Sequence, residues 1–288
     1  MSAATGMVVD GALELVPGLT VQNWHDDPAF RLKIGNDGRA VPGRSVRGFT
    51  FHSTHGVPGG SDNRPQRVLP GAGPPGGGAE ANIRYWTSSS SSGGAHLLVD
   101  YDGQVICAAD LVREETYHAT SVNGVTVGIE IVQGLTDKPH ADGGAPHGYA
   151  FFYQKQIDVV VALGDWLTRR FRRPRQIQSP YHGSSHPVDR LVHGGADCLG
   201  VYMHRDQTSN RGPGDAGDCI LQAFLAAGYE AVDFAAGTDK TLWMKRQGDL
   251  NLLGAALVVD GIPGLATMAA VEKYWAKKHG QIVVRPGD

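Results

Sequence analysis

The stretch that decides the fold is VRGFTFHST, residues 46–54. Successive side chains of a β-strand point to opposite faces of its sheet. In a strand here, Phe49 and Phe51 would point to one face. Thr50 and His52 would then point to the other face, toward a groove or solvent. The pattern predicts a strand with an apolar core on one side and room for polar chemistry on the other.

The segments around this strand predict a mixed α/β fold. VTVGIEIVQ, residues 125–133, is apolar enough for a central strand, and residues 95–110 predict a hairpin turning at an Asp-Gly pair. Apolar residues recur at helical spacing over residues 151–171. A second helix is expected over 216–227, closed by Gly228. We therefore expect a mixed central β-sheet flanked by helices.

Changes in composition divide the chain into four segments. Forty of the 288 residues are glycine, and a Gly/Pro-rich loop runs over 56–80. The expected segments are an irregular N-terminal wrap over 1–45, a main domain over 46–230, a linker over 231–240 and a helical C-terminal unit over 241–288.

Charge and composition exclude several classes of partner. The net charge of −3 gives no strong field toward nucleic acid. No apolar run approaches the length of about 18 residues that predicts a membrane-spanning helix, so no membrane insertion is expected. The three cysteines are widely spaced, which argues against a disulfide framework. The first residues lack the basic and apolar regions of a signal peptide.

Two histidines and one aspartate stand out among the twelve histidines and the many acidic residues. His52 lies in the first strand, His204 follows the apolar residues 201–203, and Asp215 precedes a helix start. Two imidazoles and one carboxylate would leave a fourth position of a zinc ion open, as in catalytic zinc sites. Spacing alone leaves open that these side chains bind nothing.

Four blocks of sequence carry a resemblance to a known family. They are GFTFHST (48–54), SSGGAHLLVDYDGQV (91–105), YHATSVNGVTVGIEIV (117–132) and MHRDQTSNRGPGDAGDCI (203–220). In order and spacing the chain resembles the zinc-dependent N-acetylmuramoyl-L-alanine amidases, a group shared by phage lysins, bacterial amidases and peptidoglycan-recognition proteins. The resemblance implies hydrolysis of the amide bond between N-acetylmuramic acid and L-alanine in peptidoglycan.

The resemblance also implies roles for individual residues. It makes His52, His204 and Asp215 the zinc ligands. Glu130, an ionisable residue in an apolar strand, is the expected acid–base catalyst, in keeping with the rarity of buried carboxylates without a partner or a task. Arg211 is expected to stabilise the oxyanion, in place of a lysine that many relatives use. His118, Tyr85 and Trp86 are expected to contact the substrate. The alternative is core packing for the two aromatic residues and a structural hydrogen bond for His118.

The block at 203–220 departs from the family pattern, which usually shows Asp-Pro-Gly with the Asp on zinc. If Gly212 is aligned there, the ligand is lost, and the chain would be a peptidoglycan-binding protein without catalysis. We prefer the alignment that keeps Asp215, with Asp218 as its rival. A zinc peptidase acting within the stem peptide is a further alternative. His96 is expected in the core or beside the site.

The C-terminal unit resembles a small three-helix peptidoglycan-binding repeat. Asp260, Gly261, Gly264 and Thr267 occupy its loop positions. A wall-binding unit raises the effective concentration of an enzyme at an insoluble polymer. Together with the absent signal peptide, it favours a phage or prophage lysin that is made in the cytoplasm and acts on the cell wall.

Overall fold

The computed structural model of the 288-residue chain provides the description of its fold. It describes residues 5–33, 35, 37–54, 78–88, 93–119, 122–136, 149–178, 200–204, 216, 218–232, 244, 247–248, 250–252, 254–262, 264, 266–267, 270 and 281–284. Within these ranges, no helix is both long enough and apolar enough to cross a membrane.

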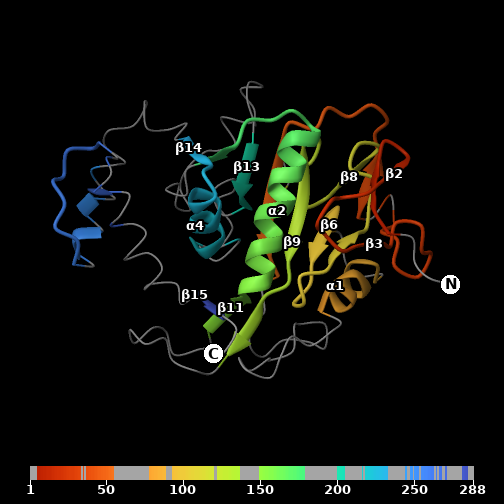
Figure 1. Cartoon of the computed structure of the whole chain (residues 1–288), viewed down its shortest axis with the longest axis horizontal. Helices are drawn as coiled ribbons and strands as arrows, with labels where there is room; N and C mark the ends of the chain where they lie inside the picture. Colours follow the sequence, from red (N-terminus) through yellow and green to blue (C-terminus); the bar gives the residue numbers. More distant parts are fainter. Residues whose placement is uncertain are drawn as a thin grey trace.

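A mixed eight-stranded sheet forms the centre of the molecule (Figure 1). The five pairings from β14 to β6 are parallel, β6 and β7 are antiparallel, and β3 adds parallel to β7. In spatial order the strands are β14 (Glu230–Val232), β12 (Gln176–Gln178), β13 (Gly200–Met203), β5 (Gly48–Ser53), β9 (Thr126–Ile131), β6 (Leu97–Val99), β7 (Val105–Cys107) and β3 (Val21–Asn23).

Helices cover both faces of this sheet. α2 (Gln154–Arg170) and α4 (Asp218–Ala226) lie side by side on one face. α1 (Gly78–Trp86) packs on the opposite face. The expected fold, a mixed central sheet flanked by helices, is confirmed.

The core beneath α2 and α4 follows from the alternation in β5. Phe49 and Phe51 are fully buried, and the Phe51 ring meets Phe224 of α4 edge-on at 5.2 Å between centroids. Gly164 of α2 leaves room for the Phe224 ring, since a Cβ at this position would come within 2.5 Å of the ring. Burial of such rings supplies the main driving force for folding, about 25 cal/mol per Å² of apolar surface.

α2 itself shows why the helical spacing was informative. Its buried face includes Ile157, Val160, Leu163 and Leu167, three or four residues apart. The helix starts later than predicted because residues 149–153 form the strand β11 (Tyr149–Tyr153). The side chain of Gln156 accepts a hydrogen bond from the Tyr153 N–H at 2.9 Å and so caps the first turn.

The N-terminal segment is not irregular, so that prediction is wrong. It forms four strands, of which β3 joins the main sheet. β1 (Met7–Val9) and β2 (Ala12–Glu14) make a hairpin, and β4 (Gly38–Ala40) pairs with β8 (Glu114–Thr116). Strands of three residues are too short to show a period of two, which is why the sequence pattern did not indicate them.

Among the other predicted strands, the first strand, the hairpin and the central strand are confirmed as β5, β6–β7 and β9. The predicted second helix is confirmed as α4, with Gly228 beyond its end at φ +84°. In its described part, residues 171–178, the predicted loop after α2 contains the strand β12.

The last described strand ties the end of the chain to the main domain. β15 (Gln281–Val284) pairs in parallel with β11, which also pairs with β10 (Gly134–Thr136). β15 belongs by sequence to the segment expected to be a separate C-terminal unit. That segment therefore leaves the main sheet after β14 and contacts the main domain again at β15.

Part of the C-terminal unit is organised around one buried amide. The Gln247 amide nitrogen donates to the Asp260 carboxylate at 2.8 Å and to the Ile262 carbonyl at 3.0 Å, and it lies 3.1 Å from the Thr267 hydroxyl. Its oxygen accepts from the Gly261 N–H at 2.8 Å. Gly261 has a φ of +74°, so the turn requires its conformational freedom. The loop residues singled out in the sequence thus form one hydrogen-bonded turn.

Candidate active site

Three adjacent parallel strands bring chemistry-bearing side chains to one row. His52 of β5 is the register partner of Glu130 of β9. His204 directly follows β13, and its ring centroid lies 4.2 Å from that of His52. The carboxyl ends of parallel strands meet at one edge of a sheet, where α/β proteins commonly bind ligands. The sequence pattern placed His52 on the face opposite Phe51, which packs against α4.

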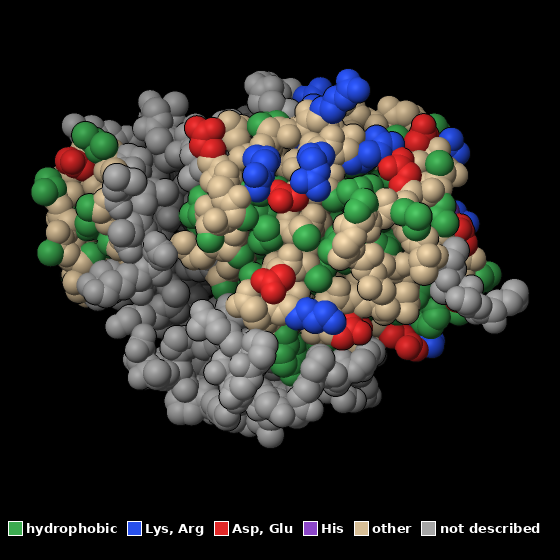
Figure 2. Space-filling model, in the orientation of Figure 1, with side chains coloured by type: hydrophobic (Ala, Val, Ile, Leu, Met, Phe, Trp, Pro, Cys, Tyr) green, Lys and Arg blue, Asp and Glu red, His purple; other side chains and the backbone are tan. Residues whose placement is uncertain are grey.

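Both histidines in this row are removed from solvent. His52 is 4% exposed and His204 is 1% exposed, whereas Glu130 is half-buried. On the side of the sheet covered by α2, Figure 2 shows basic, acidic and apolar side chains. Phe49 and Phe51 pack toward α2 and α4, so the alternation in β5 puts the His52 imidazole on the face that α2 does not cover.

His118 lies over Gly128 of β9, beside His52. Its Nδ1 is 3.0 Å from Nε2 of His52, and its ring stands over Gly128, where an added Cβ would come within 2.5 Å of the imidazole. Burial, and then the nearby His204 and Arg44, lower the pKa of His118 to about 3. His118 is therefore a neutral imidazole at physiological pH.

A buried polar network supports the site from beneath. The Arg44 guanidinium donates to the backbone carbonyls of Leu111, Asn123 and Thr126 at 2.6–2.9 Å. Burial lowers the pKa of Arg44 to about 10, so the group stays charged. These bonds fix the segment that carries His118 against the sheet.

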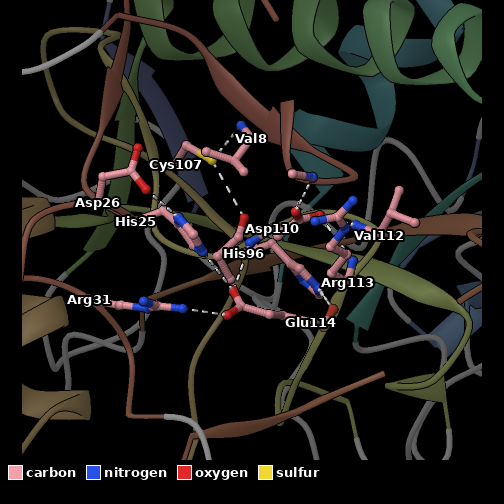
Figure 3. Close-up of polar contacts among 12 residues, drawn as sticks. Val8, His25, Asp26, Arg31, His96, Cys107, Asp110, Val112, Arg113 and Glu114 are labelled. Atoms are coloured by element: carbon pink, nitrogen blue, oxygen red, sulfur yellow. Dashed lines mark hydrogen bonds and ion pairs between the residues drawn. The ribbon is translucent and has the colours of Figure 1, made fainter. Parts of the chain in front are cut away.

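His96 belongs to this network rather than to the row of site residues. It is fully buried, and its Nδ1 accepts from the Gly128 N–H at 3.0 Å. Its Nε2 lies 3.0 Å from the Glu114 carbonyl (Figure 3) and 2.9 Å from a guanidinium nitrogen of Arg44. Burial, together with Arg44, lowers the pKa of His96 well below its usual value. The expectation of a core or supporting position for His96 agrees with this placement.

A family comparison covers the residues of this row. Residues 42–214 match the family described as N-acetylmuramoyl-L-alanine amidase. The chain belongs to this amidase family. The match includes the strands that carry His52 and Glu130 and the position of His204, and it ends at Gly214, one residue before Asp215.

Solved structures similar to this amidase-family chain include lysins and a recognition protein. A mutant endolysin from Bacillus subtilis is 18% identical over 54% of this chain and 78% of its own, with a TM-score of 0.35. The amidase LysC from Clostridium intestinale URNW is 15% identical over 65% and 90%, with a TM-score of 0.35. The Drosophila peptidoglycan recognition protein SD is 12% identical over 75% and 98%, with a TM-score of 0.42. No curated protein sequence matches the chain.

The donor set of the amidase-family chain suits a divalent metal in part. His52 and His204 offer imidazole nitrogens, which zinc binds readily. No three His, Cys, Asp or Glu side chains within the described part of the chain are arranged to hold a metal ion. Asp215, the expected third ligand, lies outside the described residues, and so does Arg211. The imidazole pair fits zinc, and the carboxylate that would complete the set remains a prediction.

The two aromatic residues expected to contact substrate lie at the end of α1. Tyr85 is 43% exposed, and Trp86 packs partly buried against the apolar cluster beneath α1. Asp218, the rival to Asp215, is the first residue of α4. These placements leave Tyr85 accessible to a ligand and give Trp86 a packing role.

Two residues around the site were given no functional role in the sequence analysis. Thr50 is fully buried on the His52 face, and its hydroxyl has no hydrogen-bond partner in the described part of the chain. Thr126 lies 3.3 Å from the His118 ring. The same alternation that exposed His52 to the site face identifies Thr50, whereas contact between Thr126 and His118 depends on a turn that strand periodicity does not reveal.

Proposed function

We propose that the chain is a zinc-dependent amidase that hydrolyses the bond between N-acetylmuramic acid and L-alanine in peptidoglycan. One observation carries the proposal: His52 and His204 approach to 4.2 Å between ring centroids, beside Glu130, at the carboxyl edge of three parallel strands. The family match over residues 42–214 supports the same substrate class.

In this proposal, His52, His204 and Asp215 hold the zinc ion. Zinc bound there would polarise the substrate carbonyl and lower the pKa of a bound water toward about 7. The closeness of the two imidazoles, both buried at one edge of the sheet, supports their role as joint ligands. Glu130 pairs with His52 across β5 and β9, a position from which its carboxylate can accept a proton from the attacking water and pass it to the leaving amine.

Other residues would bind and orient the substrate. Arg211 is proposed to face the oxyanion, in place of the lysine that many family members use. Tyr85, exposed on α1, is proposed to stack on a sugar ring, with Trp86 beside it. His118 contacts His52 and so lies at the edge of the reacting centre.

The C-terminal unit is proposed to bind peptidoglycan and to keep the enzyme on the wall. The hydrogen-bonded turn at Gln247 and Asp260 supports a defined fold for its loop. A tether of this kind favours a lysin acting on intact cell wall, which is insoluble, over an enzyme that recycles soluble fragments. We propose a C-terminal unit over 241–288, with β15 as the point where it contacts the main domain again. The main sheet includes β3, before the expected boundary at residue 46, and extends to Val232 of β14, beyond the one at residue 230.

The test combines metal analysis with digestion of purified cell wall. We expect one zinc per chain, clearing of a sacculus suspension, loss of clearing on chelation and recovery on adding zinc. Mass spectrometry of the digest should show stem peptides with a free L-alanine amine. Binding to sacculi without clearing would favour the non-catalytic alternative, and cuts within the stem peptide would favour a peptidase.

A further inference from the structure

Both ring nitrogens of His118 have defined partners. Nδ1 lies 3.0 Å from Nε2 of His52, and Nε2 lies 3.3 Å from the hydroxyl oxygen of Thr126. Gly128 leaves the space that the ring occupies. His118 is 9% exposed, so these contacts, rather than water, determine where its proton lies.

The Thr126 hydroxyl has one proton, and of its two neighbours the Val122 carbonyl is the one that can only accept it. It donates to the Val122 carbonyl at 3.0 Å. Toward His118, the Thr126 oxygen can therefore only accept. Nε2 of His118 must carry the proton, and Nδ1 of the neutral ring carries the lone pair.

The same reasoning extends to the next imidazole. Because His118 Nδ1 accepts, Nε2 of His52 must donate the hydrogen bond that joins the two rings. A neutral His52 then carries its lone pair on Nδ1. The Thr126 hydroxyl, which acts on His52 through His118, thus determines which nitrogen of His52 can bind a cation.

We propose that Thr126 and His118 are positioning residues that hold His52 in the Nε2–H form, so that Nδ1 is its metal-binding nitrogen. The inference rests on the proposed function for the metal only, since the arrangement of protons exists without it. Partners that donate to or accept from the second nitrogen of a metal-binding histidine fix its tautomer and orientation, and their loss typically lowers metal affinity about 10- to 100-fold.

Thr126→Val tests the relay with little change in shape. It removes the hydroxyl but keeps the backbone carbonyl that Arg44 contacts, and the Val122 carbonyl keeps its bond from the Val125 N–H. Thr126→Ser keeps the hydroxyl and is the matched control. We expect zinc affinity, measured by competition with a chromophoric chelator, to fall about 10-fold or more in Thr126→Val and to stay within about twofold in Thr126→Ser.

The second measurement needs no metal and no activity. Long-range ¹H–¹⁵N correlation spectra of the metal-free chain report the protonated nitrogen of each histidine. Resonances are assigned by their absence in His52→Ala and His118→Gln. We expect both His52 and His118 in the Nε2–H form in the wild type and in Thr126→Ser, and mixed tautomers in Thr126→Val.

The two measurements separate this inference from the proposed function. An Nδ1–H form of His52 in the wild type overturns the relay, even if zinc binds and the wall is cleaved. Unchanged zinc affinity and unchanged tautomers in Thr126→Val overturn it too. If zinc does not bind the wild type, the proposed function fails, and the spectra still decide the relay. The wild-type spectra also decide it if Thr126→Val does not fold.

Discussion

The two faces of β5 have different tasks although they alternate residue by residue. One face carries Phe49 and Phe51, fully buried against α2 and α4. The other carries Thr50, whose hydroxyl has no hydrogen-bond partner among the described residues, and His52, which contacts two further imidazoles. Burying polar groups costs free energy of folding, and the apolar packing on the first face offsets this cost for the polar groups on the second. The comparison teaches that stability and chemistry can be changed separately in one strand.

The strongest test of this separation is His52→Ala. We expect wall-clearing activity and stoichiometric zinc binding to be lost, because one of the two described imidazoles in the row is removed. The melting temperature of the metal-free chain should change little, since the apolar core lies on the other face. Thermal denaturation in a chelator, compared with the wild type, checks this, and a variant that clears sacculi normally would remove His52 from the site.

Glu130→Gln sharpens the comparison within the polar face. We expect kcat to fall about 100- to 10,000-fold, the usual range for loss of a general acid–base group, with zinc still bound. The amide keeps the size of the side chain and removes its ability to accept a proton. Initial rates on sacculi and zinc content of the same samples measure this. Loss of zinc together with activity would instead make Glu130 a ligand or a support of one.

Phe51→Ala tests the opposite face. We expect a loss of about 3–5 kcal/mol in the free energy of unfolding, because a fully buried ring that meets Phe224 is replaced by a cavity. Thr50→Val, one residue away and on the polar face, is the matched control and should change the same quantity by less than about 1.5 kcal/mol. Denaturant titration of the metal-free chains measures both. Equal losses in the two variants would mean that the faces are not independent.

The smallest expected effect concerns a histidine outside both faces. The ion pair with Glu114, Nε2 to Oε2 at 3.3 Å, raises the pKa of His25 despite its burial (Figure 3). Burial alone would raise the pKa of Glu114, but hydrogen bonds from His25 and the Asp110 N–H outweigh it and lower that pKa. The His25 contribution is therefore fully present below about pH 6.5 and is lost as the pH rises through the raised pKa.

His25→Gln should accordingly destabilise the chain more at pH 5.5 than at pH 8.5, by up to about 1 kcal/mol, the range of a single ion pair. Melting temperatures of both chains at the two pH values measure the difference. His25→Gln should leave wall clearing at pH 8.5 unchanged. A larger destabilisation at pH 8.5 would contradict the assignment of the raised pKa to this pair.

The sequence predicted the parts of the fold that have long, regular patterns. The alternation in β5, the apolar run of β9 and the helical spacing of α2 all correspond to elements of the structure. The N-terminal strands and β12 have three residues each, too few for a period to appear, and β15 is recognised only through its pairing with β11. Apart from the local β1–β2 hairpin, these strands form by pairing with strands distant in the sequence, which a local pattern does not contain.

For the candidate site, alternation and family resemblance together indicated His52, Glu130 and His204, which the structure brings into one row. The same reasoning gave His118 as a substrate contact and did not foresee its hydrogen bond to His52, since that bond depends on Gly128 and on the turn that carries Thr126. Asp215 and Arg211 lie outside the described residues, and their roles stay predictions.

The parallel pairing of β15 with β11 has a consequence for how the C-terminal unit could be separated from the enzyme. The unit is bounded by β14 in the main sheet and β15 in the smaller one, so it is an insertion held at both ends rather than a tail held at one. Cutting the chain after β14 would also remove an edge strand that pairs with β11 and contacts α4. A deletion that joins β14 to β15 through a short linker would keep this edge strand. It would then change only the proposed binding of the enzyme to the cell wall.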